Sequence, residues 1–500
     1  MKFSNTALAL TALAADWAAA GSIKPSCQCC KALATAPSLV GKVWAPNDER
    51  YDARLAEYYS ANAAQAPWCM VLPESTEDVS ALMKVLTQYS CPFGMRSGAH
   101  TAFQGGNGIK DGVTVDFGHL NVTTYDESTQ VASMNPGQTW GDAYKVLADY
   151  SVVAIGGRAD VVGVGGFTTG GGYSFHTGVR GFACDNVVNF EVVLGDGSIV
   201  NANAEENHDL WVALKGGSGN FGFVTRIDQK VWPSSEIYAN LNSYSIDKRP
   251  EVRQRYYDFV NKQDDEPESQ IIGAMSYADG AWACAIIMSN INAEISDVFD
   301  PFFEVESTTS VPATGPAHEV VPIFTGPTPL GLYANWQTGM VDHNLEIMEA
   351  MDEIVMEYFN KAIGLVEDGE NKIQLIWQWQ PVTQGIVDVM QKQGGNVLGL
   401  DATVVDGPVI MYNIVFTADT EETQAATLPT IFALNQAILA KADELGHNKH
   451  WQFLNYAHGS QDPISHYGAD NIALMKAVSA KYDQGQVFQN LRQTGFKLPA

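Results

Sequence analysis

Two segments rich in small residues constrain what this chain can fold into more than any other feature. The first is the loop Arg96-Ser97-Gly98-Ala99-His100-Thr101, and the second holds eight glycines between Gly156 and Gly172. A loop that wraps a diphosphate must bring backbone N–H groups close to the anion, and small side chains permit that approach. Tight turns in a β-rich domain use the same residues, and a lone loop histidine is more often a surface or core residue than a ligand. The pattern therefore allows either a phosphate-binding loop with a reactive histidine or a set of structural turns.

A third glycine motif excludes one common dinucleotide fold. Residues 217–222 read Gly-Ser-Gly-Asn-Phe-Gly and fit the pattern G-x-G-x-x-G. A helix-like segment precedes this motif and a strand-like segment follows it, whereas the Rossmann arrangement requires a strand and then a helix. The sequence therefore predicts that this is not a Rossmann fold, and no P-loop motif G-x-x-x-x-G-K-[ST] occurs in the chain.

Apolar periodicity predicts an α+β unit as far as about Pro233. Ser75 is expected to cap a helix that ends near residue 89, because Asp78 lies three residues after the cap and an apolar face follows. Other helices are expected over 51–59, 140–150 and 209–215, and strands over 91–95, 112–117 and 221–231, with a hairpin over 190–200.

After Pro233 the chain has fewer glycine loops and more acidic helical runs. A helix is expected over 345–367 and strands over 271–277, 282–289, 373–380 and 409–417, followed by a helix over 472–482. These runs predict a second α+β domain with an antiparallel sheet.

The charge of the chain excludes two classes of partner. The formal net charge is −28, from 29 basic and 57 acidic residues. Such a charge repels nucleic acid and anionic membranes, so we expect neither as a partner. No apolar segment after the N-terminus is long enough to span a bilayer.

The N-terminus predicts secretion. Lys2 precedes an apolar run over 7–15 and the small residues 18–20, which is the pattern of a signal peptide over 1–20. Seven cysteines then indicate disulfides and leave at least one thiol over, and 121–123 is a glycosylation acceptor. Cys27, Cys29 and Cys30 have no second cluster at ligand spacing, so no metal site is predicted.

A family resemblance rests on motifs in a fixed order. Beside the loop 96–101 these are 161–166 (Val-Val-Gly-Val-Gly-Gly), 170–173 (Gly-Gly-Gly-Tyr), 183–187, 209–217, 222–226, 394–396 and Asn455-Tyr456. They resemble the FAD-linked oxidoreductases of the vanillyl-alcohol oxidase and p-cresol methylhydroxylase superfamily, in the fungal berberine-bridge-enzyme-like branch.

The resemblance implies a place for each motif around FAD. His100 would bond to the 8α carbon of the flavin, Val224 would contact the adenine through its backbone, and Asn455 would lie near the flavin. The pyrophosphate would be held by two groups of residues. These are Arg96, Ser97, Gly98, Ala99 and Thr101 in the first loop, and Gly163, Gly165, Gly166, Gly171 and Gly172 in the second segment. Val162, just before Gly163, is also placed at the cofactor, because the residue there influences oxygen access to the flavin in relatives.

Two departures from the family pattern sharpen this expectation. Many relatives tie the flavin a second time through a cysteine at the place of Ala159, so a single link through His100 is expected here. Relatives often carry a tyrosine at the position of Phe453, and that tyrosine helps to accept the substrate proton. Phenylalanine cannot titrate, so in this chain the base is expected to be another residue or to be dispensable. Val162, before Gly163, matches the valine that accompanies oxidase behaviour in relatives, although a valine in a strand is also ordinary.

The catalytic candidates follow from the same comparison. Tyr456 is the first candidate for the base and Tyr173 the second, although either tyrosine could serve packing alone. Gln378 and Gln380 alternate with Trp377 and Trp379, so the glutamines share one face of a strand and could line the substrate pocket.

The resemblance implies a two-part FAD-binding domain of the p-cresol methylhydroxylase type and an α+β substrate domain with an antiparallel sheet. The expected divisions are a signal peptide (1–20), an N-terminal segment (21–64), the main FAD-binding part (65–233), a substrate domain (234–449) and a C-terminal segment that returns to the FAD domain (450–500). The expected function is a secreted oxidase that moves hydride from a small-molecule alcohol or activated C–H substrate to FAD, with oxygen as the acceptor. The alternatives are a dehydrogenase with another acceptor, a flavin-dependent cyclase and a non-catalytic binding protein.

Overall fold

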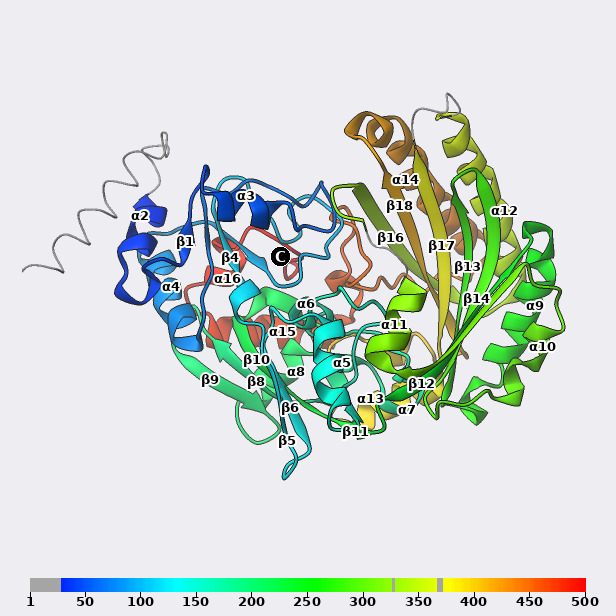
Figure 1. Cartoon of the computed structure of the whole chain (residues 1–500), viewed down its shortest axis with the longest axis horizontal. Coiled ribbons are helices and arrows are strands. Elements are labelled where there is room, and N and C mark those ends of the chain that lie inside the picture. Colours follow the sequence, from blue (N-terminus) through cyan, green and yellow to red (C-terminus); the bar gives the residue numbers. More distant parts are fainter. Residues whose placement is uncertain (1–27, 326–328, 367–371) are drawn as a thin grey trace, which may run out of the picture.

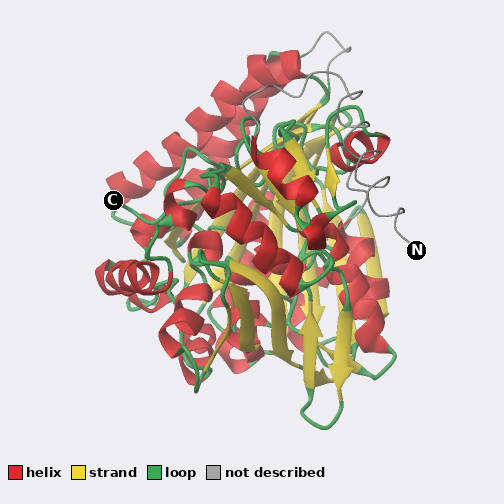
Figure 2. Ribbon diagram, turned by 90° about the vertical axis from the view of Figure 1, so that its left-hand side faces the viewer, coloured by secondary structure: helices red, strands yellow, loops and turns green. Residues whose placement is uncertain are grey.

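The computed structural model describes residues 28–325, 329–366 and 372–500. The expected signal peptide and Cys27 lie outside these residues. The chain forms three main sheets with helices on either side of the strands (Figures 1 and 2). The predicted α+β class is confirmed.

The first sheet carries the histidine loop. Its strand order is β1-β2-β4-β3, with β2 and β3 parallel to β4 and β1 antiparallel to β2. Its strands are β1 (Val43–Trp44), β2 (Cys69–Val71), β3 (Phe93–Arg96) and β4 (Val113–Asp116), and its helices are α2 (Gln28–Thr35), α3 (Glu49–Leu55), α4 (Thr76–Gln88) and α16 (Val487–Asn490).

Helix α4 shows how the sequence dictates this layer. The Ser75 hydroxyl accepts a hydrogen bond from the Asp78 N–H (3.2 Å), which satisfies one free donor at the start of the helix. Val79, Leu82 and Leu86 are fully buried on one helix face. The predicted cap and face are confirmed, while the helix expected over 51–59 is shorter and ends at Leu55.

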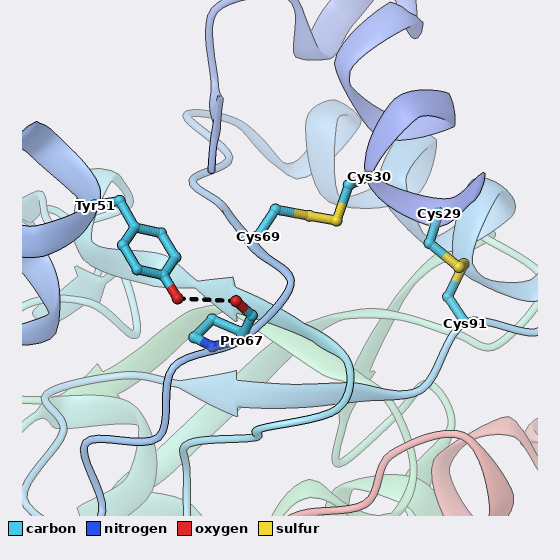
Figure 3. Close-up of a disulfide and its surroundings, with 6 residues drawn as sticks. All are labelled: Cys29, Cys30, Tyr51, Pro67, Cys69 and Cys91. Atoms are coloured by element: carbon cyan, nitrogen blue, oxygen red, sulfur yellow. Dashed lines mark hydrogen bonds between the residues drawn. A yellow bond between two sulfur atoms is a disulfide. The ribbon is translucent and has the colours of Figure 1, made fainter. Parts of the chain in front are cut away.

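Two disulfides fix α2 to this sheet. Cys30 is bonded to Cys69 at the start of β2, and Cys29 is bonded to Cys91 just before β3 (Figure 3). The predicted use of cysteine in disulfides is confirmed for these four residues. The remaining described cysteines, Cys184 and Cys284, are buried and form no disulfide.

The second sheet is antiparallel, with the order β5-β6-β10-β8-β9. Its strands are β5 (Thr123–Asp126), β6 (Val131–Met134), β8 (Val187–Val193), β9 (Ile199–Asn203) and β10 (Phe223–Lys230). Around it lie α5 (Trp140–Ala148), α6 (Val164–Thr169), α7 (Thr177–Arg180), α8 (His208–Leu214) and α15 (Ala469–Tyr482), with the short pair β7 (Val152–Val153) and β11 (Trp232–Pro233).

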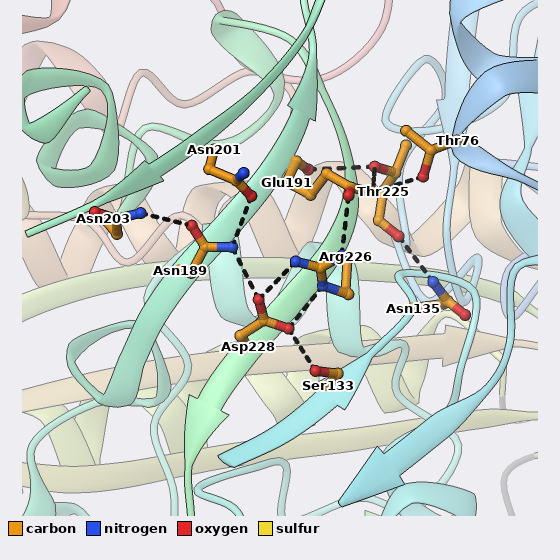
Figure 4. A network of polar contacts seen from close by, with 10 residues as sticks. All are labelled: Thr76, Ser133, Asn135, Asn189, Glu191, Asn201, Asn203, Thr225, Arg226 and Asp228. Carbon is orange, nitrogen blue, oxygen red and sulfur yellow. Dashed lines mark hydrogen bonds and ion pairs between the residues drawn. The ribbon is translucent and has the colours of Figure 1, made fainter. Parts of the chain in front are cut away.

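Polar cross-strand contacts fix the register of this sheet (Figure 4). Arg226 on β10 pairs with Glu191 of β8 (2.9 Å) and, along its own strand, with Asp228 (2.8 Å); Asp228 accepts hydrogen bonds from Ser133 of β6 (2.6 Å) and Asn189 of β8 (2.8 Å). Thr76 at the start of α4 donates to Glu191 (2.6 Å), which joins the first layer to the second. As predicted, α8 precedes the glycine motif 217–222 and β10 follows it, so the order is opposite to that of a Rossmann unit.

The third sheet is the antiparallel sheet predicted after Pro233. Its seven strands run in the order β15-β12-β14-β13-β17-β18-β16, and every pairing is antiparallel, as predicted. The strands are β12 (Glu236–Tyr244), β13 (Ser269–Ala278), β14 (Ala281–Asn290), β15 (Thr309–Pro316), β16 (Tyr333–Asp342), β17 (Ile373–Val382) and β18 (Val409–Ala418).

The two faces of this sheet have different neighbours. Helices α9 (Arg249–Val260), α10 (Asp300–Phe303), α12 (Leu345–Gly364) and α14 (Glu421–Leu445) pack on the face turned away from the first two sheets (Figure 1). Met340, Val382 and Met411 on the other face belong to the apolar core that continues into the second sheet. Helices α11 (Ala317–Thr325) and α13 (Gln384–Lys392) complete this part.

The last residues return to the first sheet. The Phe93 N–H donates to the Leu491 carbonyl, and the Gln493 N–H donates to the Phe93 carbonyl, so the C-terminal segment lies along β3. No helix within the described ranges is long and apolar enough to cross a membrane.

Candidate active site

The histidine loop starts where β3 ends, and Arg96 anchors it. The Arg96 guanidinium is buried, lies 3.3 Å from Asp116 and donates to the Arg54 carbonyl (2.6 Å). It also lies over the Tyr58 ring at 4.1 Å. These contacts hold the Arg96 side chain in place and so fix the start of the histidine loop. Ala99 has a φ of +56°, so the chain turns sharply just before His100.

The His100 ring is held between two aromatic side chains. It stacks on Tyr59 with ring centroids 4.2 Å apart and 12° between the planes, and Trp336 of β16 meets it edge-on at 5.7 Å. Burial lowers the pKa of His100 to about 4. The imidazole is therefore neutral at neutral pH and has a nitrogen lone pair available for bonding.

The two glycine-rich segments predicted from the sequence meet backbone to backbone. A Cβ on Gly98 would lie 2.4 Å from the Gly163 nitrogen, so neither glycine tolerates a side chain. The Ser97 hydroxyl donates to the Pro136 carbonyl, and Gly165 packs against Pro136. Thr101 follows His100 and is half-buried.

The other glycines of the second segment differ in their surroundings. Gly166 is exposed on α6, and a Cβ there would meet no protein atom within 4 Å. Gly171 and Gly172 have φ of +120° and +82°, and each packs tightly against aromatic side chains, Phe453 and Phe167 respectively. Their positions are therefore explained by the turn and its packing, and their contact with a cofactor stays a prediction.

Asn455 lies at the end of α6. Its side-chain NH₂ donates to the Phe167 carbonyl (3.2 Å), and its buried amide oxygen has no hydrogen-bond partner. Val162 is half-buried and its carbonyl accepts from the Trp140 N–H. Val224 is buried in β10, next to a shift in strand register.

Three of the four predicted catalytic side chains lie together around Arg158. The Arg158 guanidinium donates to the Tyr456 hydroxyl oxygen (2.8 Å) and to the Gln380 amide oxygen, and it lies 4.6 Å from the centre of the Tyr173 ring. The Gln380 amide also donates to Tyr456 (3.2 Å). Trp336 meets the Tyr456 ring edge-on at 6.0 Å and so joins this cluster to His100.

The two tyrosines have different environments. The Tyr173 hydroxyl is buried, donates to the Pro381 carbonyl (2.8 Å) and lies 3.1 Å from the Gln270 amide oxygen. Burial raises the pKa of Tyr173 well above its usual value. Tyr456 is half-buried, and its oxygen accepts from two donors.

Gln378 lies two residues before Gln380 on β17 and is half-buried. The alternate residues Trp377 and Trp379 are buried in the core against the helices. The predicted alternation is therefore observed, and the tryptophan face is the packing face.

Sequence reasoning missed Arg158, Tyr59 and Trp336. Arg158 lies between the two glycine clusters of the second segment, where a charged side chain is a departure from the small residues around it. That departure was the only local signal. No local sequence signal marks Tyr59 or Trp336, because each is notable only for the contact that it makes with the His100 ring in the folded chain.

The residues present fit a flavin dinucleotide. Gly98 and Gly163 bring the two loops together where no side chain fits, and Gly166 on α6 has open space at its Cβ position. Asn455, against α6, has a buried amide oxygen without a partner among the described residues, and His100 supplies a neutral nitrogen. In the described parts of the chain, no group of three or more His, Cys, Asp or Glu side chains could hold a metal ion.

Comparison with known proteins agrees with this geometry. Residues 67–203 match the FAD binding domain family. An FAD-dependent monooxygenase from Aspergillus calidoustus is 34% identical over 486 residues, which cover 94% of this chain and 90% of that protein. The chain belongs to the same family of fungal FAD-dependent enzymes as this relative. It is an FAD-dependent oxidoreductase, which confirms the resemblance, the enzyme class and the cofactor expected from the sequence.

Solved structures share the fold of this oxidoreductase. 6-Hydroxy-D-nicotine oxidase from Arthrobacter nicotinovorans superposes with a TM-score of 0.75 at 16% identity, covering 93% of this chain and 99% of that one. Glucooligosaccharide oxidase from Acremonium strictum has a TM-score of 0.70 at 17% identity, with 91% and 96% covered. The FAD of the latter protein carries 6-S-cysteinyl and 8α-N1-histidyl links.

Proposed function

We propose that this protein is a secreted flavoprotein oxidase of a small-molecule alcohol, or of another C–H bond activated by a neighbouring heteroatom. FAD, when bound, supplies the hydride acceptor and passes the electrons to oxygen, which yields hydrogen peroxide. The protein binds and orients the substrate and takes its proton.

The observation that carries this proposal is the pair of hydrogen bonds that Tyr456 accepts. Arg158 and Gln380 both donate to its phenolic oxygen. The Arg158 hydrogen bond is charge-assisted and the Gln380 hydrogen bond is a neutral one, and both favour negative charge on the oxygen that they contact. Tyr456 is therefore our choice for the group that accepts the substrate proton, while Gln380 and Gln378 face the substrate from β17.

Tyr173 is the weaker candidate for the base. Its raised pKa and its bond to the Pro381 carbonyl both keep the proton on its hydroxyl. Its ring face holds the Arg158 guanidinium, so we assign it to positioning Arg158.

We further propose that His100 is the single covalent tether of the flavin. Its neutral imidazole supports bonding to the 8α carbon, and the ring contact with Tyr59 fixes its plane. The segments 96–101 and 163–172 would hold the pyrophosphate, with Asn455 near the flavin and Val224 at the adenine. Ala159 takes the place where many relatives carry a second, cysteinyl tether.

Acid precipitation of the purified protein tests the tether. We expect yellow colour to stay in the pellet of the parent protein and to be absent from the pellet of His100→Ala. His343→Ala is a matched control, because His343 also stacks on a tyrosine (Tyr257, 4.4 Å) and burial also lowers its pKa to about 4. Free flavin in the supernatant of the parent would contradict covalent attachment.

Oxidase chemistry is tested by the reaction of the reduced protein with oxygen. Stopped-flow mixing should show fast reoxidation with one peroxide formed per substrate oxidised. Slow reoxidation with fast transfer to a quinone would favour the dehydrogenase alternative, and anaerobic turnover with the flavin left oxidised would favour the cyclase.

Monooxygenation is the second candidate, because the Aspergillus calidoustus relative is named as a monooxygenase. That reaction places one oxygen atom in the product and one in water, and it needs two further electrons from a reductant. Product formed under ¹⁸O₂ distinguishes the two: label in the product, with little peroxide, would replace the oxidase proposal.

Secretion rests on the predicted signal peptide and is supported by the two disulfides, which persist in oxidising compartments. Recovery of the processed, disulfide-bonded protein from culture medium is the expected result.

A further inference from the structure

Asn413 is a buried polar residue whose side chain makes no hydrogen bond to the described part of the chain. It lies in the middle of β18 and is fully buried, yet neither its amide oxygen nor its amide nitrogen has a hydrogen-bond partner among the described residues. Burial of an amide without partners is unfavourable, and most buried polar side chains are therefore paired. An unpaired amide at the centre of a regular sheet calls for a ligand.

The side chain of Asn413 points toward the FAD-binding half of the molecule. Tyr412 and Ile414 belong to the core between the sheet and its helices, whereas Met411 belongs to the core shared with the second sheet. Because side chains alternate along a strand, Asn413 shares the face of Met411. Its direct neighbour on β17 is Gln378, which is half-buried and lies on the same face.

Strand register also sets the distance from Asn413 to the catalytic cluster. Gln380 pairs with Met411, so Asn413 is the diagonal neighbour of Gln380. Such neighbours are about 7–8 Å apart in an antiparallel sheet. Gln380 also donates to Tyr456, so Asn413 lies one diagonal strand position from a residue that contacts the proposed base.

We propose that Asn413, together with Gln378, binds a neutral hydroxyl group of the substrate on the far side of the molecule from the carbon that is oxidised. This rests on the proposed oxidase function and names the chemical class of its substrate. A carboxamide offers one acceptor and two donor hydrogens, and a hydroxyl both donates and accepts, so the two groups can satisfy each other. A carboxylate would leave the amide oxygen facing an anion and is disfavoured.

Thermal unfolding of the holoenzyme tests whether the Asn413 amide is unpaired. Replacing an unpaired buried amide with an apolar side chain of similar size removes a desolvation cost, so Asn413→Leu should raise Tm, by about 2 °C. Asn413→Val is the second variant, because a β-branched residue suits a strand.

Asn435→Leu is the matched control. Asn435 is equally buried, but its oxygen accepts from the Tyr412 hydroxyl (2.8 Å), on the opposite face from Asn413. This variant should lower Tm because it leaves that hydroxyl unpaired. If both Asn413 variants lower Tm as Asn435→Leu does, the amide is paired in the fold and the proposal is overturned.

Ligand binding tests the substrate class without turnover. The probes are resorcinol, its methyl ether 1,3-dimethoxybenzene, and methyl glucoside, titrated calorimetrically into the holoenzyme. We expect resorcinol to bind more tightly than its ether, and Asn413→Leu to weaken resorcinol binding about tenfold while Asn435→Leu leaves it unchanged.

The other outcomes are also decisive. If methyl glucoside alone shows binding that depends on Asn413, the hydroxyl is that of a sugar and the proposal holds with a carbohydrate substrate. If no probe shows dependence on Asn413, the proposal is overturned. Because neither measurement involves peroxide, failure here is separate from failure of the oxidase function.

Discussion

Replacing Asp116 with asparagine is expected to destabilise the layer that carries His100. Asp116 is fully buried at the end of β4 and accepts two hydrogen bonds from Arg54, each 2.8 Å long, and one from the Gly118 N–H (2.9 Å). Arg96, which begins the histidine loop, lies 3.3 Å away and is only 1% exposed. The variant keeps the size of the side chain but removes the carboxylate nearest to the Arg96 guanidinium among the described residues; Glu57, the other one, is half-exposed and 3.9 Å away.

The size of the effect follows from this burial. Removing one partner of a buried ion pair costs about 3–5 kcal/mol, because the other charge stays buried without compensation. Arg54 is partly exposed and is also paired with Glu57, so the lower value of about 3 kcal/mol applies. For a folding unit of 150–250 residues this corresponds to a fall in Tm of ~6–12 °C.

Asp48→Asn is the matched control. The ion pair of Asp48 with Arg50 is on the surface, and such pairs contribute ~0–1 kcal/mol, so its Tm should change by less than about 3 °C. The assay is calorimetric unfolding, with flavin content measured on the same samples. If Asp116→Asn melted within 2–3 °C of the parent, like the control (about 1 kcal/mol), the buried charges would not hold the loop and the argument would fail.

The same site predicts a dependence on pH. Burial raises the pKa of Asp116, but Arg96, Arg54 and the Gly118 N–H together hold it below its usual value. A carboxyl with a lowered folded-state pKa stabilises the protein above its unfolded pKa of about 3.9, and that contribution is lost as pH falls through the folded pKa. The difference in Tm between parent and variant should therefore be constant above about pH 5 and should shrink below about pH 4.

Two further predictions address the site directly. Tyr456→Phe should lower the rate of flavin reduction ~100-fold or more, as expected for loss of a proton acceptor, whereas Tyr173→Phe should stay within about tenfold of the parent; equal effects would contradict the choice of base. Gly166→Ala adds a Cβ where no protein atom lies within 4 Å, so Tm without flavin should be unchanged while flavin content falls. Gly98→Ala, by contrast, should lower Tm itself, because its Cβ would meet the Gly163 backbone at 2.4 Å. A normal flavin content in Gly166→Ala would show that Gly166 is not part of the cofactor site.

Local features of the fold were predictable from the sequence. The Ser75 cap, the apolar face of α4, the alternation of Gln378 and Gln380 with two tryptophans, and the reversed order around the glycine motif 217–222 were all visible. Each depends on residues within a few positions of one another, so backbone geometry alone brings them together. The cofactor class was expected from the family resemblance of the ordered motifs, because the small residues by themselves fitted structural turns as well as a phosphate-binding loop.

The catalytic cluster was predictable only in part. Tyr456 and Gln380 were named from the sequence, but Arg158, which contacts both, was not, because it lies 298 and 222 positions away from them. The pairing of Cys29 with Cys91 and of Cys30 with Cys69 depends in the same way on how α2 docks against the first sheet.

The sequence by itself determined the helices, the strands, the faces that they bury and the loop that can lie against a dinucleotide, because these follow from periodicity and from the absence of side chains. Only the tertiary structure decided what His100 stacks on, which residue holds Tyr456, and that Asn413 has no partner. These are contacts between segments far apart in the chain, and they form only when the register of the sheets and the docking of one sheet on another set the distances.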